Sequence, residues 1–118
     1  MKLAIRSAGA ITAVALLLTA CAGSLQGDLY QTLYASQATL TASETVAKQY
    51  VEGSFGKPDA AVAADLKTYD AKAYAALHPL VLDAQAGESV STMAVTTAQS
   101  YVTDFYSYLA SHNVGGVK

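Results

Sequence analysis

The sequence predicts an all-α protein whose folded part is an antiparallel three-helix bundle. Apolar side chains recur three and four residues apart in three successive segments, which is the period of an amphipathic helix. Alanine is abundant and alternating β-branched runs are few, so strands are disfavoured. The connections near 53–58 and 87–88 are short, and short connections make neighbouring helices antiparallel. The alternative is a dimer of helical hairpins with a loosely attached third helix.

The first 20 residues have the organisation of a cleaved export signal. Lys2 and Arg6 supply positive charge, and an uncharged run of 11 residues follows from Ala8 to Leu18. A membrane-spanning helix needs about 20 apolar residues. An apolar core of about 7 to 15 residues behind a positive start is typical of a secretory signal peptide instead. We therefore expect residues 1–20 to be removed.

Residues 18–21, LTAC, contain the single cysteine of the chain and resemble the lipobox of bacterial lipoproteins. The resemblance implies that the Cys21 thiol receives a diacylglycerol, that cleavage occurs before Cys21 and that the new amino terminus is acylated, for example with palmitate. Two or more acyl chains anchor far better than one, because each buried methylene contributes about 0.8 kcal/mol. In this family, Ala22 and Gly23 after the cysteine imply the periplasmic face of the outer membrane when the host is Gram-negative. An ordinary signal peptide with a stray cysteine is the alternative.

Residues 21–27 are small and polar and predict a lipidated tether, and the bundle is predicted over 28–112. Asp28 is the expected N-cap of the first helix, because its carboxylate can accept from the exposed amides of the first turn. Gly53 and the GKP stretch at 56–58 end this helix. Its apolar face consists of Leu29, Leu33, Leu40, Ala47 and Val51, widened by Tyr30, Tyr34 and Tyr50 and interrupted by Ser36 and Ser43.

The second helix is predicted to start at Asp59 and to end near Ala86, since Gly87 suits the left-handed position after a helix. Pro79 lies inside it, where a proline removes one backbone hydrogen bond and clashes with the preceding turn. The sequence therefore predicts a kink or a break at Pro79 and leaves the choice open. Alternating steps of four and three, typical of shallow helix packing, define the predicted seam: Val62, Leu66, Tyr69, Ala73, Ala76 and Leu80.

The third helix is predicted to begin after a cap at Ser89, and a flexible tail is expected over 113–118. Gly115 and Gly116 give that tail its expected mobility. An abundant family of helical outer-membrane lipoproteins ends in a lysine that is joined to peptidoglycan. This chain resembles that family only in its terminal residue, Lys118, which is therefore a candidate for attachment to murein. The alternative is that Lys118 is an ordinary charged end of the chain. The predicted apolar stripe is Val90, Met93, Ala94, Thr97, Tyr101, Phe105, Tyr108 and Leu109.

Composition narrows the classes of partner. After removal of the signal, five lysines and nine acidic residues remain, a net charge of −4. Nucleic-acid binding needs clustered basic residues, so we expect none. One cysteine excludes an internal disulfide and a cysteine zinc site. His78 and His112 have no partner at ligand spacing, and we expect no metal and no cofactor.

Catalytic patterns are also missing from the sequence. There is no G-x-S-x-G elbow, no P-loop and no Rossmann glycine pattern. Asp65 and Asp70 lie near Lys67 and Lys72, which predicts a solvated face with lysine partners. General acid–base catalysis needs a pocket that shifts a pKa, and a small bundle rarely encloses one. We therefore expect no enzymatic activity.

The chain contains eight tyrosines, which are candidates for core positions or for an exposed binding surface. Tyr34, Tyr69, Tyr74 and Tyr101 are expected in the core, with their hydroxyls at its edge. Tyr106 lies off the main stripe of the third helix, where an exposed ring can contact a protein or a glycan strand. The simpler interpretation of Tyr106 is a wide apolar face on that helix.

The sequence thus predicts a small lipid-anchored periplasmic protein with a structural or protein-interaction role in the cell envelope. Acyl chains on Cys21 are the expected contact with the membrane, and an envelope protein or a second copy is the expected partner. The alternative is a phage- or plasmid-encoded envelope lipoprotein that acts in lysis or exclusion.

Overall fold

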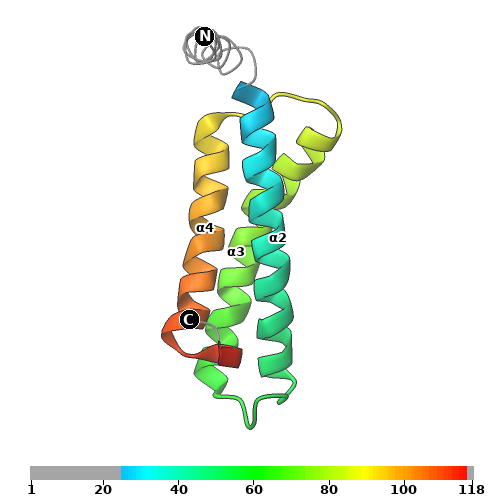
Figure 1. The fold of residues 1–118 in the computed structure, drawn as a ribbon. Helices are drawn as coiled ribbons and strands as arrows, with labels where there is room; N and C mark the ends of the chain where they lie inside the picture. Colours follow the sequence, from blue (N-terminus) through cyan, green and yellow to red (C-terminus); the bar gives the residue numbers. More distant parts are fainter. Residues whose placement is uncertain (1–24, 117–118) are drawn as a thin grey trace, which may run out of the picture.

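The computed structural model describes residues 25–116, and these form three α-helices and one short 3₁₀ turn (Figure 1). The elements are α2 (Leu25–Val51), α3 (Ala60–Gln85), α4 (Thr92–Ser111) and η1 (Val114–Gly116). Each helix packs against both others, so α4 is not loosely attached and the predicted three-helix bundle is confirmed. In Figure 1 the start of α2 lies at the same end as the α3–α4 connection.

Helix α2 begins earlier than the sequence predicts. It starts at Leu25, so Asp28 lies inside the first turn and is not the cap. Gln26 belongs to the helix, and its amide holds the α3–α4 connection: Nε2 donates to the Val90 carbonyl at 3.0 Å and Oε1 accepts from the Val90 amide at 2.8 Å. The Tyr30 hydroxyl donates to the Glu88 carbonyl at 2.6 Å. Residues 25–27 are therefore part of the bundle and not part of a tether.

The buried seam of α2 contains the two serines that the sequence treats as interruptions. Ser36 is 7% exposed and Ser43 is 3% exposed, and both face the other helices. Val51, predicted on the same face, is instead half exposed, because α2 ends there. Steps of four and three residues separate the buried positions Leu29, Leu33, Ser36, Leu40, Ser43 and Ala47.

Helix α3 has the predicted ends. The Asp59 side chain caps it, with Oδ1 accepting from the amides of Ala61 at 2.8 Å and Val62 at 3.2 Å. Gly87 follows with a φ of 75°. The helix runs through Pro79 without interruption, so the predicted break is wrong, and a kink is not confirmed. Pro79 is on the exposed side of α3, where water can bond the carbonyl that loses its partner.

The buried face of α3 departs from the predicted seam after Ala73. Leu66 and Ala73 are buried as expected, but Ala76 and Leu80 are only partly buried. A helix turns once in 3.6 residues, so a strict seven-residue seam drifts about 20° per heptad away from its neighbour. Burial therefore passes one position along the chain, to Leu77, Val81 and Ala84.

Helix α4 starts two residues later than predicted. Ser91, and not Ser89, is its N-cap, and its Oγ accepts from the Ala94 amide at 3.0 Å. Phe105 and Leu109 are buried as expected, whereas Met93 is 80% exposed. In the first half of the helix the predicted stripe is one position out of register. The buried residues are Val95, Ala98, Val102, Phe105 and Leu109.

The chain after α4 is docked on the bundle as far as Gly116. Val114 is 2% exposed, and η1 contacts both α2 and α4. Gly115 has a φ of 59°, and a Cβ there would lie 2.9 Å from the Phe55 ring and from the Val46 side chain. The expectation of a mobile tail is therefore wrong for 114–116, because a buried valine and a tightly fitted glycine hold this turn.

Truncation of Leu66 tests the position of the α3 seam. Leu66 is 1% exposed, so we expect Leu66→Ala to lower the free energy of unfolding by about 2 to 5 kcal/mol. Leu82 on the same helix is 50% exposed, and Leu82→Ala should change it by less than about 0.5 kcal/mol. Urea unfolding measures both. Equal losses in the two variants would show that the seam is misplaced.

A comparison of two glycines tests the docked turn. Gly87 and Gly115 both have positive φ, so alanine at either position costs about 1 to 2 kcal/mol of backbone strain. Nothing lies within 4 Å of a Cβ at Gly87, whereas Phe55 and Val46 crowd one at Gly115. We expect Gly115→Ala to destabilise the protein more than Gly87→Ala. Adding Phe55→Ala to the Gly115→Ala variant should remove part of this extra loss, because the crowding ring is then absent. Equal thermal unfolding midpoints for the two alanine variants would contradict the docking.

Candidate functional site

An open groove between α2 and α3 brings together two carboxyl groups that are 26 positions apart in the sequence. Glu44 on α2 and Asp70 on α3 both line the groove, whose volume is about 560 Å³. Ala47 and Leu66, two core residues, form part of its lining. Its other lining residues are Lys48, Val51, Glu52, Ala63, Ala64 and Lys67.

The two carboxyl groups interact directly, and the interaction favours one shared proton. Burial, then a hydrogen bond to Asp70, then the negative charge of Asp70 raise the pKa of Glu44 from 4.5 to about 7. The protonated Glu44 carboxyl donates to the Asp70 carboxylate. Asp70 Oδ1 is buried and has no hydrogen-bond partner among the described residues. The site therefore combines two neighbouring carboxyl groups, one of which has a raised pKa, and a buried oxygen that lacks a donor in the described part of the chain.

A second, smaller hollow continues from Glu44 along the same two helices. Glu44 lines both, and the second one also contains the Tyr74 and His78 rings, which stack at 4.7 Å between centroids. Its volume is about 50 Å³. Glu44 therefore lies between the two hollows, whereas Asp70 lines only the larger one. The remaining lining residues of the smaller hollow are Gln37, Leu40, Thr41, Leu77 and Val81.

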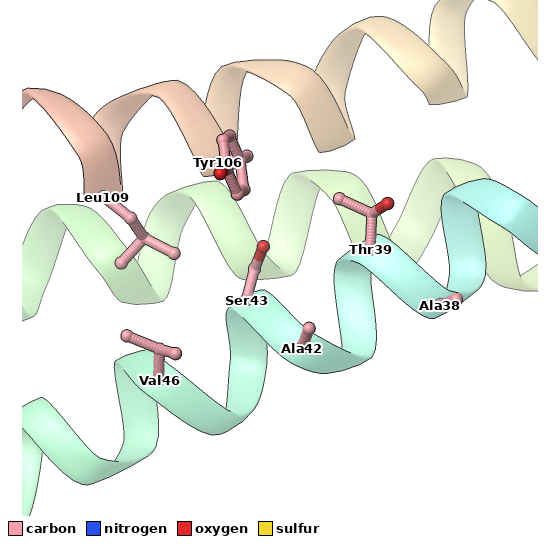
Figure 2. A pocket seen from close by; sticks show the side chains of 7 residues that line it. All are labelled: Ala38, Thr39, Ala42, Ser43, Val46, Tyr106 and Leu109. Atoms are coloured by element: carbon pink, nitrogen blue, oxygen red, sulfur yellow. The ribbon is translucent and has the colours of Figure 1, made fainter. Parts of the chain in front are cut away.

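A third hollow lies on another side of the bundle, between α2 and α4 (Figure 2). Its volume is about 330 Å³ and its lining is mostly apolar. Ser43 contributes its hydroxyl, which is buried and has no hydrogen-bond partner in the described part of the chain. Figure 2 shows the Ser43 side chain directed from α2 toward α4. The other residues that line it are Ala38, Thr39, Ala42, Val46, Tyr106 and Leu109.

The sequence-predicted attachment residues cannot be placed in this geometry. Cys21 and Lys118 both lie outside the described residues 25–116. Gly116, two residues before Lys118, belongs to η1, which packs near the end of α2. The prediction of lipid at Cys21 and of murein attachment at Lys118 thus stays a prediction from sequence.

The histidines form parts of aromatic stacks. His78 stacks on Tyr74, and His112 stacks on Tyr108 with ring centroids 4.0 Å apart. The Nδ1 atom of His112 lies 3.0 Å from the Tyr108 carbonyl and 3.0 Å from the Ser111 hydroxyl, at the end of α4. Within residues 25–116 no group of three His, Cys, Asp or Glu side chains is placed to hold a metal ion.

The predicted lysine partners of Asp65 and Asp70 are replaced by other contacts. Asp65 accepts from the Tyr108 hydroxyl at 2.9 Å, and burial followed by this hydrogen bond raises the pKa of Tyr108 to about 12. Asp70 pairs with Glu44. Lys72 lies over the Tyr101 ring, 5.4 Å from its centroid. The aspartates therefore join α3 to the neighbouring helices. Asp65 is exposed as predicted and Asp70 is partly buried, and the prediction of lysine partners is wrong for both.

The tyrosines are less buried than the sequence predicts. Tyr34 is 42% exposed and Tyr74 is 48% exposed, whereas Tyr69 and Tyr101 are partly buried at the edge of the core. Tyr106 is 42% exposed and lines the hollow between α2 and α4. A tyrosine can cover the core with its ring while its hydroxyl stays at the surface, so helical spacing alone overestimates its burial.

Sequence reasoning missed the acid pair, although a signal for it exists. Glu44 directly follows the seam residue Ser43, and Asp70 lies four residues after Leu66. Charged residues that flank a seam are the ones that meet across a helix–helix interface. The signal indicates a pairing position on each helix, but it does not say which of several acids and lysines face each other.

Comparison with known proteins adds no relative from which a role can be transferred: no family model, curated protein or solved structure matches this chain. None of the helices in the described part is both long and apolar enough to cross a membrane. A functional assignment therefore depends on the residues of this chain.

The acid pair predicts how stability changes with pH. The pKa of Glu44 in the folded protein is above its ordinary value of 4.5, so the folded state holds a proton more tightly than the unfolded state. The stability that the folded state gains from the tightly held Glu44 proton is fully present below pH 4.5 and is lost as the pH rises through about 7. We expect the free energy of unfolding, measured by urea titration at a series of pH values, to fall over this range.

The variant Glu44→Gln cannot ionise, so it should show a smaller fall than the parent over the same range. Glu52→Gln is the matched control, because Glu52 lines the same groove and should keep the full fall of the parent. If the free energy of unfolding falls equally with pH in the parent and in Glu44→Gln, the two carboxyl groups do not share a proton.

Proposed function

We propose that this protein is a lipid-anchored periplasmic protein with a structural or protein-interaction role in the cell envelope. The observation that carries the proposal is the LTAC stretch at 18–21 behind a positively charged start and a short apolar run. Acyl chains on Cys21 attach the mature protein to the periplasmic face of the outer membrane, and the helical bundle binds an envelope protein or a second copy. Enzymatic activity is not part of the proposal.

The beginning of α2 supports a bundle held close to its anchor. Leu25 is four residues after Cys21, and four extended residues span at most about 14 Å. The end of the bundle that contains Gln26 and Val90 is therefore next to the lipid in this proposal. Helix α2 has 27 residues and is about 40 Å long, so the 52–59 connection and η1 are on the side away from the membrane.

Exposed apolar side chains support a role in binding. Val51 and Phe55, at the end away from the proposed anchor, are each 49% exposed. Tyr34 and Tyr74 add two exposed aromatic rings on α2 and α3. Aromatic residues are enriched in protein interfaces because they bury a large area with few rotatable bonds.

The other role that the sequence left open is a phage- or plasmid-encoded envelope lipoprotein that acts in lysis or exclusion. It shares the anchor and differs in its effect on the host. Controlled expression separates the two roles: a structural or binding protein leaves growth and envelope integrity unchanged, whereas a lysis protein releases cytoplasmic enzymes into the medium.

The anchor is tested by replacing the one residue that can receive the lipid. We expect Cys21→Ser to lose labelling by a fatty-acid analogue and to leave the outer-membrane fraction, because serine has no thiol to form the thioether. Ser24→Ala keeps the cysteine and should label and fractionate like the parent. Equal labelling of parent and Cys21→Ser would refute the lipid anchor.

A further inference from the structure

We propose that Glu44 and Asp70 form a proton-operated latch, which holds α2 and α3 together across their groove while the two carboxyl groups share a proton and lets the groove widen when both are ionised. The latch is a property of the bundle and goes beyond the proposed role in the envelope. It does not require lipid at Cys21, so it and the anchor can fail separately.

The position of the pair makes it suited to this task. One carboxyl belongs to each helix, so the pair is a direct link between α2 and α3 across the groove. Beneath the groove lie Leu66, which is 1% exposed, and Ala47, which is 7% exposed. Separation of the two carboxyl groups would therefore give water more access to this apolar part of the groove lining.

Loss of the proton changes the link from attraction to repulsion. The protonated Glu44 donates a hydrogen bond to Asp70, and ionisation replaces it with two like charges in contact. Asp70 Oδ1 is buried and lacks a donor among the described residues, so the local structure has no second hydrogen bond that would hold the ionised pair in place. The carboxylates relieve the repulsion by moving apart toward water.

The other charges around the pair do not neutralise it in this arrangement. Lys48 and Glu52 on α2 and Lys67 on α3 line the same groove, and His78 on α3 lines the hollow on the other side of Glu44. None of these side chains forms an ion pair with Glu44 or Asp70 within the described part of the chain. No residue of α4 lines either hollow. Lys48 and Lys67 are both exposed, so solvent weakens their attraction for the pair.

Solvent access to the Leu66 methyl groups tests the latch. The full chain, carrying Cys21→Ser to avoid lipid, is labelled at its leucine methyl groups and titrated with a neutral paramagnetic chelate, whose effect does not depend on pH. We expect paramagnetic relaxation at Leu66 to rise through one transition near pH 7. Leu109, which is 0% exposed and packs in α4, should stay protected throughout.

Three variants separate the latch from a general loosening of the bundle. Glu44→Gln and Asp70→Asn are nearly isosteric and should each abolish the transition at Leu66, while Glu52→Gln should keep it. Circular dichroism shows first that each variant is helical, and the pH series of the parent needs no variant at all. A flat response at Leu66 in the parent, or a transition that survives in both Glu44→Gln and Asp70→Asn, would overturn the proposal.

Discussion

The bundle depends on the narrow seam that α2 buries against both other helices. In that seam leucines alternate with small residues: Leu33 and Leu40 are followed by Ser36 and Ser43, and Ala47 continues the row. Each fully buried leucine contributes about 1.5 to 3 kcal/mol, while the small residues let α3 and α4 approach closely. Within residues 25–116 no disulfide or metal site adds to this packing, so the fit of side chains holds the helices together with a few hydrogen bonds, such as those of Tyr108 with Asp65 and of Gln26 with Val90.

The same seam sets the chemistry of the groove. Once Ser43 faces the core, the next residue, Glu44, must lie at the edge of the α2–α3 contact, and Asp70 reaches the same edge from α3. Partial burial and the like charge of its neighbour then favour the protonated form of Glu44. The position of the acid pair is thus a consequence of helix packing, and it gives the bundle a carboxyl group that responds near neutral pH.

Local signals in the sequence predicted much of the fold. Asp59 and Gly87 lie at helix ends because one backbone geometry suits each of them, and the helical period identifies all three segments. Features that depend on how the helices are arranged in space could not be predicted from local sequence. The Gln26–Val90 contact joins residues 64 positions apart, and the shift of burial from Ala76 to Leu77 arises from the drift of a straight helix against its neighbour. The acid pair belongs to this second group, because its formation depends on the relative rotation of α2 and α3.

The most direct test of this account is the titration of Glu44 itself. Its side-chain carboxyl carbon is followed by nuclear magnetic resonance from pH 3 to pH 9 in the full chain, with Glu52 as an internal comparison. The account predicts a midpoint for Glu44 near 7, and a smaller value in Asp70→Asn, where the amide can donate to the carboxylate. A midpoint of about 4.5 in the parent would show that Glu44 and Asp70 do not share a proton and would contradict the account.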